Sequence, residues 1–88
     1  MSYKIEFLQK AKRDLKKVDR VMQVVIKEKI ITLAENPEVL KTNIKPLKGE
    51  FKNKFRLRVR DYRVIFQIEN QTVTVLIVAI GHRKEVYS

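Results

Sequence analysis

The chain has 88 residues, no cysteine, and 20 lysines and arginines against 10 acidic residues, which gives a formal charge of +10. This length predicts one small domain spanning residues 1–88, and the lack of cysteine excludes disulfides and thiolate chemistry. The sequence contains no apolar run of about 18 residues and no signal-peptide core, so we expect a cytoplasmic protein without membrane spans.

The N-terminal part of the chain predicts one strand followed by two helices. Residues 3–7 alternate between apolar and polar side chains, which is typical of a strand. Apolar residues at helical spacing predict a helix over 10–18 and a second over 20–35. Asp19 is placed to cap the second helix. Asn36 should end it, because a residue that precedes proline disfavours the helical conformation.

The C-terminal part predicts a connector and three strands. Residues 38–54 show little periodicity, whereas 55–60, 62–69 and 72–80 read as strands, the first two joined by a tight turn near Asp61. The last strand is apolar on both sides, which predicts cover on both faces. The order strand, helix, helix, strand, strand, strand (β-α-α-β-β-β) predicts an α+β fold with a helical pair on one face of a mostly antiparallel sheet.

Positive charge is concentrated in the middle of the chain. Nine bases and two acids lie between residues 41 and 63, so +7 of the total charge falls there. Arg56, Arg58 and Arg60 alternate with apolar residues and should emerge from one side of the strand about 7 Å apart. Such a row repels itself, and it suits a polyanion such as a phosphodiester backbone. The alternative is a solvated surface, but surfaces that only aid solubility mix both signs.

The sequence offers few groups for other chemistry. It contains no Gly-rich phosphate loop, and one histidine without cysteine cannot form a transition-metal cluster, so we expect neither metal nor cofactor. An enzyme built from this chain would have to use arginine, lysine, tyrosine and the single His82.

Residues 55–66 (FRLRVRDYRVIF), the apolar last strand, and residues 81–87 (GHRKEVY) together resemble the RelE/ParE toxin superfamily. The resemblance covers nearly the whole chain, including the helical hairpin and the PLKG sequence at 46–49. It implies a RelE-like fold and a toxin of a type II toxin–antitoxin system. In this superfamily the RelE branch cleaves messenger RNA in the ribosomal A site, whereas the ParE branch inhibits DNA gyrase. The RelE branch is preferred here.

Carried over position by position, the RelE resemblance implies catalytic roles for a set of arginines and one tyrosine: Arg56, Arg58, Arg63, Arg83 and Tyr87. Further residues are expected to contact RNA: Lys48, Lys52, Lys54, Arg60 and His82. The chain departs from the RelE pattern in three ways. It has arginines at 56 and 58 where RelE proteins typically carry lysines, His82 where a lysine is often found, and only one residue after Tyr87.

The reaction that the resemblance implies is RNA transesterification without a metal. A 2′-hydroxyl attacks the adjacent phosphorus and leaves a 2′,3′-cyclic phosphate and a 5′-hydroxyl. Arginines suit the stabilisation of the phosphorane charge, because a guanidinium binds two phosphate oxygens. Tyr87 is the preferred base, with nearby arginines favouring its phenolate. His82 is the rival base, because imidazole exchanges protons near neutral pH.

Two other functions remain open from the residues alone. The chain could be a ParE-like gyrase inhibitor without nuclease activity, or a basic nucleic-acid-binding module without catalysis. For a toxin, the resemblance implies an acidic antitoxin that forms a heterotetramer with it. For the RelE branch, it also implies a ribosome with mRNA in its A site as the target.

Overall fold

A computed structural model describes residues 2–48 and 53–82 of the chain. Five strands form one sheet in the order β1-β5-β4-β3-β2, with β1 parallel to β5 and every other neighbouring pair antiparallel. This confirms the predicted α+β fold. The elements are β1 (Lys4–Phe7), α1 (Gln9–Lys16), α2 (Arg20–Glu35), the 3-10 helix η1 (Pro37–Asn43), β2 (Ile44–Pro46), β3 (Lys54–Val59), β4 (Tyr62–Glu69) and β5 (Thr74–His82).

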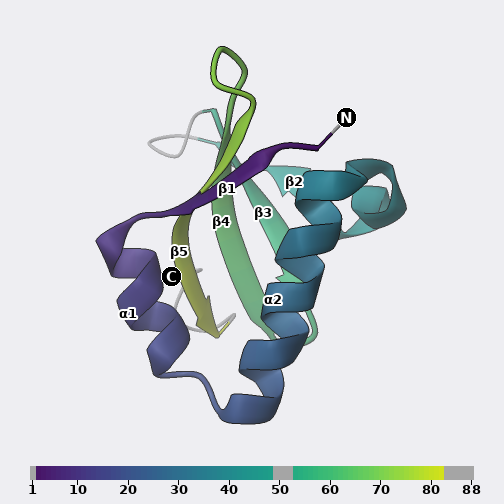
Figure 1. Ribbon diagram of the computed structural model, residues 1–88. Helices are drawn as coiled ribbons and strands as arrows, with labels where there is room; N and C mark the ends of the chain where they lie inside the picture. Colours follow the sequence, from purple (N-terminus) through teal and green to yellow (C-terminus); the bar gives the residue numbers. More distant parts are fainter. Residues whose placement is uncertain (1, 49–52, 83–88) are drawn as a thin grey trace.

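The two helices pack on the same face of the sheet (Figure 1). The α1 residues Ala11 and Leu15 and the α2 residues Ile26 and Ile30 are buried there against the sheet. The sheet contributes the apolar side of its three central strands to this core: Leu57, Val59, Val64, Phe66, Val75, Ile77 and Ile80. The opposite face of the sheet carries polar side chains as well as one buried apolar residue, Ile65.

The predicted signals at both ends of α2 are confirmed. The Asp19 carboxylate accepts a hydrogen bond of 3.3 Å from the Met22 backbone N–H, as an N-cap residue should. Asn36 leaves the helical conformation with φ −153°, directly before Pro37. Thus α2 has the predicted bounds, while α1 ends two residues before the predicted end at Val18.

The segment predicted as an irregular connector contains two elements that the sequence did not indicate. Residues 37–43 form η1, and β2 pairs antiparallel with β3 at the edge of the sheet. A strand of three residues is too short to show alternation. Pro46, which lacks a backbone N–H, is tolerated there because edge strands do not need every donor.

Two strand predictions were wrong in detail. Strand β3 ends at Val59, and Arg60 lies in the following turn with φ 55°. Strand β5 begins at Thr74, after Val73 with φ 51°, and it continues to His82. On the helix side β5 is covered as expected, whereas on its other face Leu76 and Ala79 are half-buried. No helix among residues 2–48 and 53–82 is long and apolar enough to cross a membrane.

Candidate nucleic-acid interface

Strand β3 separates apolar from basic side chains, as its alternation predicted. Leu57 and Val59 are buried in the core under the helices. Successive residues of a strand point to opposite faces, so Arg56 and Arg58 point to the face away from the helices. We call this side of the sheet the basic face and define it by five residues: Lys45, Lys54, Arg56, Arg58 and Arg63.

The pairing register brings these bases together across strands. Arg58 of β3 lies directly opposite Arg63 of β4, and Lys45 of β2 lies opposite Arg56 of β3. Directly opposed residues in an antiparallel pair have Cβ atoms about 4.5–5.5 Å apart, and like charges at that distance destabilise the sheet. A phosphate bound beside such a pair would offset this repulsion.

Arg63 is the most constrained base of this face. Its side chain is buried, with 8% exposure, although it carries a charge. Its Nη1 donates to the backbone oxygen of Arg60 at 3.3 Å and to that of Tyr62 at 3.1 Å. These carbonyls belong to the tight turn between β3 and β4, so the hairpin orients the guanidinium. A preoriented guanidinium loses less conformational entropy when it binds phosphate.

The other basic-face residues differ in how far they reach into solvent. Arg58 and Lys45 are exposed, whereas Arg56 and Lys54 are half-buried. Lys45 was not among the predicted site residues. It joins the face only because β2 pairs with β3, and that pairing had no signal in the sequence. The arrangement therefore has a fixed arginine beside exposed cations, which suits a phosphate backbone.

Arg60 does not share the basic face with Arg56 and Arg58. The turn sends its side chain toward α2, where Nη1 approaches Sδ of Met22 at 4.0 Å. The expectation that three arginines form one row was wrong for this reason: the alternation stops when the strand ends at Val59. The RNA contact predicted for Arg60 would have to be made from the β3–β4 turn.

His82 lies on the helix side of the sheet. It pairs with Tyr62, while its neighbour Gly81 pairs with Arg63 on the basic face. The rings of His82 and Tyr62 meet edge to face, with centroids 5.6 Å apart and an interplanar angle of 76°. This contact places the imidazole beside Tyr62, on the face opposite Arg63, and the role of His82 as the rival base stays a prediction.

Four predicted residues remain, and the structure describes only one of them, Lys48. Lys48 is exposed in the segment after β2. Lys52, Arg83 and Tyr87 lie outside the described residues, so their predicted roles stay predictions. Within residues 2–48 and 53–82, no group of three or more histidine, cysteine or acidic side chains is placed to hold a metal ion.

A family model and several known toxins match this chain along almost its whole length. The family model described as "ParE toxin of type II toxin-antitoxin system, parDE" matches residues 5–87. Toxin RelG of Mycobacterium tuberculosis is 32% identical, over 99% of this chain and 98% of that protein. The mRNA interferase toxin RelE of Escherichia coli (strain K12) is 27% identical, over 100% of this chain and 93% of that protein.

A solved structure shares the fold as well. The toxin–antitoxin complex RelBE2 of Mycobacterium tuberculosis contains a chain that superposes with a TM-score of 0.82 at 28% identity, covering 94% of this chain and 100% of that chain. The resemblance predicted from the sequence is thereby confirmed. The match of the family model to nearly every residue shows that this chain belongs to the RelE/ParE superfamily of toxins from type II toxin–antitoxin systems.

Proposed function

We propose that the chain is a toxin that acts in the cytoplasm as a ribosome-dependent mRNA endoribonuclease. The observation that carries the proposal is the pairing of Arg58 with Arg63 across β3 and β4, which places two arginines on the basic face. Two neighbouring guanidinium groups suit the binding of one phosphodiester, whereas like charges in direct register do not help a sheet to fold. Similarity to a relative named as an mRNA interferase, along the full chain, supports RNA as the substrate.

The proposed reaction is an internal transesterification of RNA. The 2′-oxygen attacks the adjacent phosphorus as its proton is removed, and the 5′-oxygen leaves as it gains a proton. Arg63 and Arg83 bind the scissile phosphate and stabilise the added negative charge, while Arg56 and Arg58 hold the neighbouring backbone. Tyr87 takes the proton of the 2′-hydroxyl. Lys45 and Lys54 supply sequence-independent phosphate contacts.

Dependence on the ribosome is what the resemblance to the RelE branch implies, and the small number of groups at this site is in keeping with it. Positioning the 2′-hydroxyl in line with the leaving oxygen contributes several kcal/mol to catalysis, up to about 7–11 kcal/mol in model reactions. Arginines on a sheet face can bind phosphate, but they cannot hold an RNA strand in that conformation. A ribosome that presents mRNA in its A site would supply the missing alignment.

The test is induced expression of the protein in bacterial cells, followed by mapping of mRNA 5′ ends. Wild-type protein should create new 5′-hydroxyl ends within translated codons, and Arg83→Ala should remove them. Lys29→Ala, which deletes an exposed base of α2, serves as a control of equal charge and should cleave like wild type. New ends that persist with Arg83→Ala, or an absence of new ends with wild type, would contradict the proposal.

A second candidate function is inhibition of DNA gyrase, as in the ParE branch. The description of the matching family model, which names ParE, favours keeping it. Purified protein can be tested in parallel on gyrase supercoiling and on programmed ribosomes. Inhibition of supercoiling without mRNA cleavage would support the second function over the first.

The proposed partner is an acidic antitoxin, assembled with the toxin as a heterotetramer. A groove of about 650 Å³ runs between α1, α2 and β1. Its floor is apolar, with Ile5 36% and Ile31 47% exposed. Its rim is basic: Lys12, Arg13, Lys16 and Lys27. An amphipathic segment with one apolar and one acidic side would bury this floor and pair with this rim.

A further inference from the structure

The last part of β5 extends past the strand that covers its outer edge. Strand β1 pairs with β5 from Thr74 to Ile77, and the backbone N–H of Leu8 donates to the Ile77 oxygen at 2.9 Å. Beyond that point the chain of β1 turns into α1, whereas β5 continues to His82. Helix α1 runs beside this end of β5 (Figure 1). The backbone groups at that edge need another partner, because a buried N–H without one is costly.

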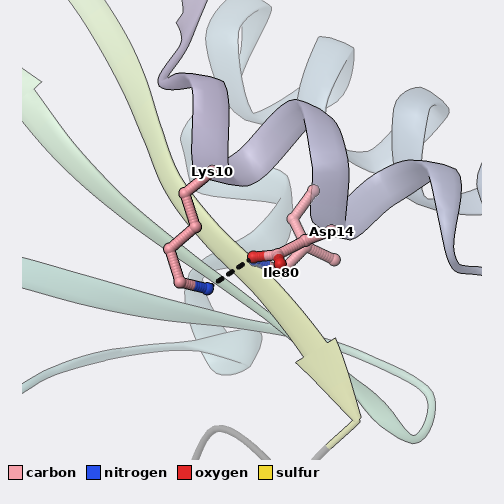
Figure 2. Close-up of polar contacts among 3 residues, drawn as sticks. All are labelled: Lys10, Asp14 and Ile80. Atoms are coloured by element: carbon pink, nitrogen blue, oxygen red, sulfur yellow. Dashed lines mark hydrogen bonds and ion pairs between the residues drawn. The ribbon is translucent and has the colours of Figure 1, made fainter.

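Asp14 of α1 supplies that partner. Its Oδ2 accepts a hydrogen bond of 3.0 Å from the backbone N–H of Ile80 and a second of 2.9 Å from Nζ of Lys10 (Figure 2). Asp14 is only 14% exposed, whereas the Lys10 side chain is 63% exposed. The contact with Lys10 is therefore a surface pair worth little, and the charge-assisted bond to Ile80 is the stronger one.

The identity of residue 14 is unusual for its helix. It is the only acid in α1, whose sequence QKAKRDLK otherwise carries four bases. A helix that served only to add positive charge would gain from another base here. A carboxylate turned toward the sheet indicates that its contact with the β5 backbone is what the position requires.

We infer that Asp14 is a positioning residue that holds the end of β5 in place beside β4. This end places Gly81 opposite Arg63, and Arg83 follows His82 directly in the chain. Asp14 would thus act on the proposed RNA site through β5, from the helix side of the sheet. The expected effect of Asp14 on mRNA cleavage rests on the proposed function, whereas its expected effect on β5 does not.

The effect on β5 is tested by amide hydrogen exchange of the full-length protein. Asp14→Ala should raise the exchange rate of the Ile80 amide at least about tenfold, as expected when a hydrogen bond of this kind is lost. Asp14→Asn keeps a carbonyl oxygen and should stay closer to wild type. Glu28→Ala removes an exposed acid from α2 and should leave Ile80 unchanged. An exchange rate of the Ile80 amide in Asp14→Ala equal to that of the wild type would overturn the inference.

The effect on function is tested by single-turnover cleavage of mRNA on programmed ribosomes. Displacement of a reacting group by about 1 Å can cost about 100-fold in rate, so Asp14→Ala should cleave at least about tenfold more slowly at saturating protein, with an unchanged half-saturation concentration. Asp14→Asn should recover most of the rate. Ile30→Val, a core change in α2, controls for lower stability and should cleave normally.

Two results would count against Asp14 as a positioning residue for this reaction. If the acid acted only through its charge, Asp14→Asn and Asp14→Ala would behave alike, and both would bind RNA more tightly. If the contact were merely structural, Asp14→Ala would cleave like Ile30→Val. Failure of the wild type to cleave would refute the proposed function instead, and the exchange of Ile80 would still decide the role of Asp14 at β5.

Discussion

At the scale of single residues, the burial and fixed orientation of Arg63 are the strongest indication of a phosphate site. It is buried, and two backbone carbonyls of the β3–β4 turn hold one of its terminal nitrogens. Burial of a charge costs free energy unless hydrogen bonds compensate it, and the turn carbonyls supply such bonds to Arg63. Arg58, paired directly opposite on β3, brings a second arginine to the same face, and two neighbouring guanidinium groups suit a phosphate.

We therefore predict that Arg63→Ala lowers the single-turnover rate of mRNA cleavage by about 100- to 1,000-fold, the usual cost of one preorganised donor. Arg63→Lys should restore little, because an ammonium cannot contact the turn carbonyls and a phosphate with the same planar geometry. Cleavage on programmed ribosomes measures the rate, and circular dichroism confirms that each variant is folded. A fully active Arg63→Lys would show that charge alone matters.

The choice of proton acceptor gives a second prediction. Tyr87→Phe should reduce the cleavage rate far more than His82→Ala, since the His82 ring packs against Tyr62 on the side opposite the basic face. The two variants are compared at saturating protein in the same ribosome assay. A larger loss from His82→Ala than from Tyr87→Phe would reverse the assignment.

At the scale of elements, the sequence predicted a helix or strand correctly wherever residues close to one another in the chain determine its conformation. Asp19 and the Asn36–Pro37 pair fix both ends of α2, alternation identified β3, and the apolar run after the turn at Asp61 identified β4. Strand β2 had no such signal, because it exists only through its pairing with β3. The bounds of β5 shifted for a similar reason. A residue with positive φ, Val73, extends the β4–β5 loop, and nothing in its side chain favours that conformation.

The helical pair gives a third prediction, on partner binding. Lys12→Glu combined with Lys16→Glu reverses the charge along one rim of the groove and should weaken binding of the acidic antitoxin at least about tenfold, as expected for two repelling contacts. The variant should still cleave mRNA, because these lysines lie on the helix side of the sheet. Titration calorimetry with the co-expressed, purified partner measures the affinity.

A matched change isolates the groove from net charge in that experiment. Lys29→Glu alters an exposed base of α2 that does not line the groove, and it should bind the antitoxin like wild type. Equal weakening by Lys29→Glu and by each single groove change would show that the antitoxin responds to overall charge. The groove would then not be its binding site.

At the scale of the whole molecule, the sequence predicted the arginines of the basic face but not the residues that surround or support them. Arg56 and Arg58 follow from the local alternation of β3, and Arg63 follows from the resemblance to the RelE branch. Lys45 and Asp14 depend on contacts between distant parts of the chain, since Asp14 and Ile80 are 66 residues apart. Periodicity cannot report such contacts. The sheet order, with β1 beside β5, had to be known before either residue could be placed.

The charge of +10 raises the question of whether RNA binds to a defined face or to the molecule at large, and salt dependence can answer it. Each phosphate neutralised on a single strand contributes about −0.7 to the slope of log affinity against log salt concentration. Arg58→Gln should thus make the slope for a short RNA shallower by about 0.7, whereas Lys29→Gln should leave it unchanged. Fluorescence anisotropy over a range of salt concentrations measures both. Equal changes of the slope in the two variants would mean that RNA responds to the overall charge of the molecule. The proposal that the Arg58–Arg63 pair binds one phosphate would then be wrong.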